Sequence, residues 1–158
     1  MNGVHAKTRG VKGWLLFLCV SLSILDPLAT LLYLTLMTAM TKQYFDTSPQ
    51  LMRLMLIHGT CGIGLAVFSI YAGLSLWRIL PGAVNTAKRY LVIAMVYSCI
   101  TPFLPYIVGL PEDFDESMKG NNLLNSLLTM SYMAVWYTYL QRSKRVQATY
   151  QETNNREE

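Results

Sequence analysis

Charge is the scarcest property of this 158-residue sequence. Only 14% of its residues are charged and 53% are apolar, whereas an average soluble domain carries roughly 25% charged residues. So few ionic side chains argue against a soluble enzyme. They also argue against a disordered chain, which would be poor in leucine, isoleucine and phenylalanine. The length allows one domain with short tails.

Cysteine and histidine are also scarce. Cys19, Cys61 and Cys99 fall in different apolar segments, without a Cys-x-x-Cys pair or a nearby histidine pair, so neither a disulfide framework nor a zinc site is expected. We interpret His58 as an interfacial residue, because the apolar segments contain no second histidine or glutamate that would complete a metal site. No cofactor is expected. The net charge of +4 does not gather on one wettable face, so nucleic acid is not an expected partner.

Four apolar runs are long enough to cross a membrane. A spanning helix needs about 20 mostly apolar residues, and the runs together hold 90 residues with one formal charge. A soluble helix of that length would show a polar face every 3.6 residues. We therefore predict an all-α integral membrane protein, a bundle of four transmembrane helices over residues 13–146, with spans at about 14–40, 54–77, 90–110 and 123–140.

The basic residues predict the orientation of this bundle. Ten of the 13 Lys and Arg residues lie in the N-terminal tail, between spans two and three, or after span four. Because basic loops stay in the cytoplasm, both the basic tail 1–12 and the polar tail 147–158 are expected there. Anionic lipid headgroups are the expected partners of this side. The first run is expected to be a retained anchor, because no Ala-x-Ala cleavage site follows it.

Small residues predict where the helices pack. In span two, Gly62 and Ala66 are four residues apart, and so are Ser69 and Gly73. Such pairs let membrane helices approach closely. We expect this face to pack on span one or span four, and contact with a second copy of the chain stays open.

Prolines predict two irregular helices. Asp26-Pro27 predicts a break in helix 1, because proline disfavours helical geometry in the residue before it. Pro102 and Pro105 predict a kink in helix 3, because each removes a backbone hydrogen bond. In a bilayer the freed carbonyls must find partners on neighbouring helices or water.

Asp26 is the one charge expected deep in the bilayer, about 18 Å from the start of span one at a rise of about 1.5 Å per residue. An ionised aspartate there costs about 2.5–3.5 kcal/mol, so Asp26 is expected to face protein or water, or to be protonated. Thr101, Tyr97 and Ser131 lie near the same depth and are its expected hydrogen-bond partners. Two interpretations stay open. Asp26 is a proton or cation site, or it caps a second half-helix that begins at Pro27.

Two stretches at the ends of the chain resemble one bacterial membrane family. Gly10-Val-Lys-Gly13-Trp14-Leu15-Leu16, followed by Pro27, is similar to the opening of the family catalogued as domain of unknown function 2569. The family's closing signature is similar to Trp136-Tyr-Thr-Tyr139-Leu-Gln-Arg-Ser143-Lys144-Arg145-Val146-Gln-Ala-Thr149-Tyr150. The resemblance implies a four-helix, multi-pass protein of the bacterial inner membrane. It brings no known activity, substrate or cofactor.

The basic end of span four is a candidate contact site. Ser143, Lys144 and Arg145 follow the span directly. Cations at a helix C-terminus complement its partial negative charge and anchor it to anionic headgroups. Contact with a cytoplasmic partner is the alternative interpretation.

These features bear on three classes of function. A non-enzymatic accessory or interaction subunit of a membrane complex is favoured, with a membrane protein or a second copy as its partner. The alternative is a small transporter or proton-coupled permease that uses Asp26, which four helices without a repeat would support as an oligomer. An enzyme is not expected, because no nucleophile with a base, carboxylate pair or metal ligand set lies at one depth.

Overall fold

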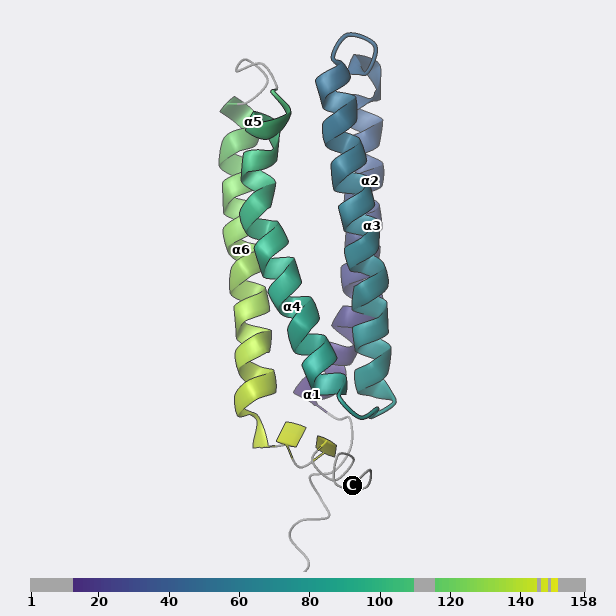
Figure 1. Cartoon of the computed structure of the whole chain (residues 1–158), viewed down its shortest axis with the longest axis vertical. Helices are drawn as coiled ribbons and strands as arrows, with labels where there is room; N and C mark the ends of the chain where they lie inside the picture. The colour runs from purple at the N-terminus through teal and green to yellow at the C-terminus, as the bar shows by residue number, and fades with distance from the viewer. Residues whose placement is uncertain (1–12, 110–115, 145, 148, 151–158) are drawn as a thin grey trace, which may run out of the picture.

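The computed structural model describes residues 13–109, 116–144, 146–147 and 149–150, and these residues form helices with no strand among them (Figure 1). The expected tail at 1–12, most of the tail at 147–158 and Arg145 lie outside the described residues. In chain order the elements are α1 (Trp14–Val20), the π-helix η2 (Ser21–Leu25), α2 (Asp26–Thr41), the 3-10 turn η3 (Lys42–Tyr44), α3 (Pro49–Trp77), α4 (Ala83–Ile100), the 3-10 turn η4 (Thr101–Phe103), α5 (Leu104–Val108) and α6 (Glu116–Arg142).

Three helical segments are long and apolar enough to cross a membrane, namely Trp14–Tyr44, Pro49–Trp77 and Ala83–Val108. They contain the first two apolar runs predicted from the sequence and residues 90–108 of the third. The fourth run lies within α6, which has 27 residues. Large apolar side chains cover the outside of these helices, with Leu28 and Val67 about 60% exposed. An apolar exterior of this kind is what helices surrounded by lipid require.

The long helices form two pairs that meet firmly at one end. α2 packs along α3, and α4 packs along α6, while α3 also contacts α4 (Figure 1). At the end that contains α1, a core of fully or nearly fully buried residues joins both pairs. This basal core includes Leu15, Leu18, Leu76, Leu91 and Leu140. At the opposite end, a distal cluster of Leu51, Leu54 and Leu104 joins the start of α3 to α5.

The expected break at Asp26-Pro27 is replaced by a change of helix type. The first helix continues from Trp14 to Tyr44 as one candidate span. Its backbone becomes π-helical over Ser21–Leu25, directly before the Asp-Pro pair. No side-chain cap marks the start of α2. The carboxylate of Asp26 is therefore free of the capping role that the sequence left open.

A hydroxyl group from α3 explains how the helix passes the proline. A π turn pairs each N–H with the carbonyl five residues earlier, as the bond from the Asp26 N–H to the Ser21 carbonyl shows. Pro27 has no N–H, so the carbonyl of Leu22 loses its partner in this register. The Ser69 hydroxyl donates to that carbonyl at 2.7 Å. The freed carbonyl is thus satisfied by the neighbouring helix.

The small residues of α3 lie against the first helix. A Cβ atom on Gly73 would lie 2.7 Å from the backbone nitrogen of Ser23, closer than real Cβ contacts allow. A Cβ atom on Gly62 would lie 3.4 Å from the Thr30 methyl carbon. The close approach at Gly73 brings α3 within hydrogen-bonding reach of the π segment. The four small residues of this face are all buried, namely Gly62, Ala66, Ser69 and Gly73.

The third helix also changes type near its prolines. η4, which contains Pro102, is a 3-10 turn between α4 and α5. Pro105 lies in the first turn of α5, where a missing N–H removes no intrahelical bond. Gly109 then ends α5 at a positive φ of 75°.

We predict that Gly73→Ala destabilises the protein and that Gly64→Ala does not. The added methyl group at Gly73 meets the backbone of the π segment, and overpacking of this kind costs about 1–3 kcal/mol. Nothing lies within 4 Å of a Cβ atom on Gly64, so the better helix propensity of alanine is expected to leave stability equal or slightly higher. Thermal unfolding of both variants in the same detergent provides the measurement. Equal shifts would contradict the close contact at Gly73.

We predict that Ser69→Ala lowers the free energy of unfolding more than Ser75→Ala does. The first change leaves the Leu22 carbonyl without its donor, at a cost of about 1–3 kcal/mol for an unsatisfied buried group. The Ser75 hydroxyl, also buried, donates at 2.7 Å to the Tyr71 carbonyl of its own helix, which a regular helix already satisfies. Denaturation in detergent distinguishes the two serines, and a smaller loss for Ser69→Ala would contradict this role.

Candidate functional site

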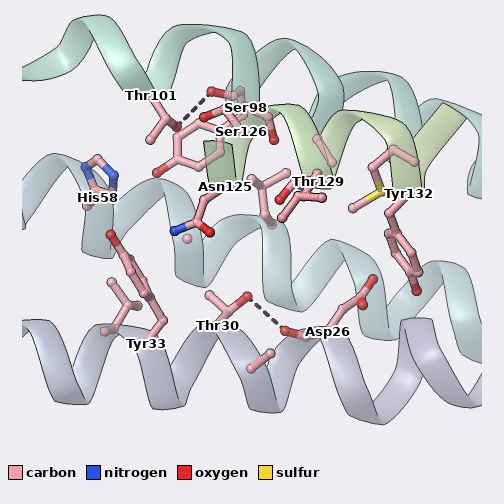
Figure 2. Close-up of a pocket in the computed structure, with 18 of the residues that line it drawn as sticks. Asp26, Thr30, Tyr33, His58, Ser98, Thr101, Asn125, Ser126, Thr129 and Tyr132 are labelled. Carbon is pink, nitrogen blue, oxygen red and sulfur yellow. Dashed lines mark hydrogen bonds between the residues drawn. The ribbon is translucent and has the colours of Figure 1, made fainter. Parts of the chain in front are cut away.

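A cavity of about 570 Å³ lies between the two helix pairs, on the distal side of the basal core. Its lining comes from α2, α3, α4, η4 and α6, and 12 of its 19 residues are polar (Figure 2). These polar groups lie in a wall whose exposed surface is mostly apolar. The polar lining residues are Asp26, Thr30, Tyr33, His58, Tyr90, Tyr97, Ser98, Thr101, Asn125, Ser126, Thr129 and Tyr132.

Asp26 is the only charged residue of this lining. It is the first residue of α2, so the π segment and its contact with α3 fix the position of the carboxylate. Its Oδ2 atom accepts a long hydrogen bond of 3.4 Å from the Tyr90 hydroxyl of α4. No lysine or arginine lines the described cavity. The negative charge is therefore uncompensated by protein cations at this position.

Four tyrosines surround the cavity. Tyr33 comes from α2, Tyr90 and Tyr97 from α4, and Tyr132 from α6. Three of the rings make edge contacts with another aromatic ring. Tyr90 meets Phe68 at a centroid distance of 5.7 Å, Tyr97 meets His58 at 6.1 Å, and Tyr132 meets Trp136 at 6.1 Å. These contacts limit the rotation of the rings at the cavity wall.

The cavity is elongated, with different groups at its two ends. Figure 2 shows Asp26 and Tyr132 at one end, and His58 with Tyr33 at the other. Asn125 of α6 lies between them in the same view. The cavity thus offers an acidic end and a neutral end rich in hydrogen-bonding groups.

His58 lies in the cavity wall, whereas we had interpreted it as an interfacial residue. Its Nδ1 atom is buried and has no hydrogen-bond partner among the described residues. A signal for this position was present in the sequence, because His58 precedes Gly62 by four residues and shares a helix face with it. The small-residue face of α3 therefore continues into the cavity.

The other predicted partners of Asp26 divide into two groups. Thr101 and Tyr97 line the cavity, although the Thr101 hydroxyl donates to the Tyr97 carbonyl of its own helix at 2.9 Å (Figure 2). Ser131 is exposed and donates at 2.8 Å to the Leu127 carbonyl, outside the lining. Helix rise predicts the height of a residue, and it does not predict the side of the helix on which that residue lies. On α6 the lining residues that the sequence did not identify are Asn125, Ser126 and Thr129.

The stretch that follows α6 is anchored beneath the bundle. Val146 and Tyr150 belong to the basal core, and the Tyr150 hydroxyl donates to the Leu76 carbonyl of α3 at 2.6 Å. Burial raises the pKa of this tyrosine above its usual value. The Ser143 hydroxyl accepts a bond of 3.4 Å from the Val146 N–H, and Lys144 is exposed. Of the two predicted contact residues that the structure describes, Ser143 and Lys144, it is Lys144 that is exposed to a headgroup or a partner.

Among the described residues, no group of three or more His, Cys, Asp and Glu side chains lies close enough to hold a metal ion. The cavity volume falls within the range of roughly 300–1,000 Å³ that is typical of small-molecule sites. The long apolar helices and their polar interior indicate an integral membrane protein with a solute-sized cavity.

The comparison with protein families identifies the chain more narrowly. It belongs to the family described as protein of unknown function (DUF2569), whose model matches residues 8–151. The resemblance noted at the two ends of the sequence is thereby confirmed. Comparisons with curated proteins and with solved structures give no match.

Proposed function

We propose that this chain is a four-span protein of the bacterial inner membrane that binds a small polar solute in its cavity, as a permease or transporter does. The observation that carries this proposal is a cavity of about 570 Å³, with a single carboxylate and several hydroxyl groups in its wall, built among helices long and apolar enough to span a membrane. Intramembrane carboxylates are costly and commonly line substrate or ion pathways. No enzymatic step is part of the proposal.

The proposed topology has α6 as the fourth span and both termini in the cytoplasm. A helix of 27 residues is about 40 Å long, enough to cross the bilayer. The excess of basic residues on the side of the basal core supports a cytoplasmic position for that side. In this orientation the basal core separates the cavity from the cytoplasm, so that solute enters from the outer side.

Two irregular helix segments flank the proposed site. The π segment directly precedes Asp26, and η4 contributes Thr101 to the wall. Segments of both types inside long helices often occur at functional sites or hinges. We propose that the expected kink of helix 3 is located at η4, where a change of angle would widen the distal end of the cavity.

We predict that Thr129→Cys reacts with a membrane-impermeant methanethiosulfonate in intact cells, in a variant without Cys19, Cys61 and Cys99. Thr129 lines the cavity, and a thiol reacts as its thiolate, which requires water. Labelling of the purified protein after treatment of the cells measures the reaction.

The matched control is Leu127→Cys, because Leu127 lies at nearly the same height on α6 but is 54% exposed outside the cavity. It is expected to stay unlabelled. A third variant, Ser143→Cys, is expected to react only after the membrane is permeabilised. Equal protection at Thr129 and Leu127 would overturn the hydrated cavity, and labelling of Ser143→Cys in intact cells would reverse the topology.

A second candidate function is that of an accessory subunit whose partner covers the open side of the bundle. α2 and α6 do not pack extensively on each other in the described residues. Tyr33 and Leu128 line the cavity from these two helices and are 40% and 60% exposed. The cavity therefore opens sideways along a seam between α2 and α6. A helix of another membrane protein or of a second copy would fill such a seam.

On the accessory interpretation, a photoreactive benzoylphenylalanine at Leu128 is expected to cross-link one defined partner in native membranes. The same residue at Leu127 is the control, because Leu127 lies next to Leu128 in sequence but outside the cavity wall. Mass spectrometry of the cross-linked product identifies the partner. Identical patterns from both positions would exclude a partner bound along the seam.

A further inference from the structure

The described lining of the cavity contains one carboxyl group and no lysine or arginine. The carboxyl group of Asp26 accepts a long hydrogen bond of 3.4 Å from the Tyr90 hydroxyl. A carboxylate away from bulk water is strongly disfavoured unless a cation or hydrogen-bond donors approach it. A positively charged ligand supplies the missing partner, whereas an anionic ligand would be repelled.

The aromatic wall also favours a cation. Tyr90 contacts the carboxylate through its hydroxyl, and Tyr132 lies at the same end of the cavity (Figure 2). Tyrosine rings attract ammonium and guanidinium groups through their negative faces, and sites for quaternary ammonium ions are commonly built from such rings. The rings of Tyr90 and Tyr132 are held by Phe68 and Trp136, so the aromatic end is preformed.

The size of the cavity and its single carboxylate favour an organic cation over a metal ion. A metal site needs several ligands around one small ion, and the described residues contain no such cluster. A volume of about 570 Å³ is far larger than one metal ion requires.

The neutral end of the cavity supplies hydrogen-bonding groups for the rest of the ligand. The His58 imidazole lies in the wall at this end. Thr101 lines the cavity near His58, and Asn125 lies between the two ends (Figure 2). A ligand with a polar substituent opposite its charge would satisfy these groups.

We propose that the solute of this cavity is a small organic ammonium ion, held at its charge by Asp26, with the aromatic rings of Tyr90 and Tyr132 beside it. This inference rests on the proposed function, because it names the chemical class of the solute that the cavity binds. The charged group lies at the acidic end, and the remainder of the molecule extends toward His58.

The test compares ammonium ions with a neutral molecule of the same shape. The purified full-length protein in detergent is titrated with choline, tetramethylammonium and ethylammonium chlorides at constant ionic strength. The neutral molecule is 3,3-dimethylbutan-1-ol, which has the shape of choline without its charge. Binding is measured by isothermal titration and by the shift of the melting temperature. At least one ammonium ion is expected to bind, and the neutral alcohol is expected to bind about tenfold or more weakly.

The variant Asp26→Asn is expected to weaken ammonium binding by about tenfold or more, since it removes the charge with little change in shape. The matched control is Asp46→Asn, because Asp46 is exposed in the loop between η3 and α3, outside the cavity. Tyr132→Phe keeps an aromatic face and is expected to retain binding, whereas Tyr132→Leu is expected to lose about threefold or more. Melting temperatures without ligand identify any variant that fails to fold.

Two results would overturn the inference, and they are distinguishable from failure of the proposed function. If the alcohol binds as well as choline, or if Asp26→Asn binds the ammonium ions as the unmodified protein does, the charge does not select the ligand. If no ammonium ion binds while Thr129→Cys is still labelled, the hydrated cavity stands and takes another class of solute. If neither binding nor labelling is found, both proposals fail.

Discussion

The arrangement of this protein depends on one backbone carbonyl. In lipid, every backbone polar group must find a partner within the protein, and Pro27 deprives the Leu22 carbonyl of one. The Ser69 hydroxyl of α3 supplies it, and Gly73 lets the two helices approach closely enough for that bond. A single proline is thereby linked to the packing of α3 on the first helix. The same contact fixes the start of α2, and with it the position of the one charged side chain in the cavity.

The two ends of the helix bundle differ in how tightly they are packed. The basal core packs leucines from the first helix, α3, α4 and α6 into one fully buried cluster, and the closing stretch adds Val146 and Tyr150 to it. Beyond that core, tyrosine and hydroxyl side chains replace leucine, and the pairs separate around a cavity. The firmly packed end provides stability, so the other end is able to keep polar groups uncovered.

Much of the fold followed from the sequence, because scarcity of charge and run length alone locate helices in lipid. The small-residue spacing of α3 also identified a buried face, since residues four apart lie on one side of a helix. The cavity followed only in part. Helix rise correctly placed Asp26 and Thr101 at one height. It did not predict that Ser131 faces outward and Thr129 faces the cavity, because the height of a residue does not determine its angular position around the helix axis. The π turn could not be predicted from the sequence either, since it depends on tertiary contacts with Ser69 and Gly73.

The position of the Asp26 carboxylate depends on the number of residues in the π segment as well as on their identity. A π turn accommodates one residue more than an α-helix holds over the same rise, and one residue corresponds to a rotation of about 100°. That surplus residue therefore rotates the side chains of α2 about the helix axis relative to those of α1. In genetic terms, a one-codon deletion within Ser21–Leu25 would keep every residue that lines the cavity. It would still turn the Asp26 side chain to a different side of the helix. Spacing in this helix is as much a determinant of the cavity as the identity of the acid.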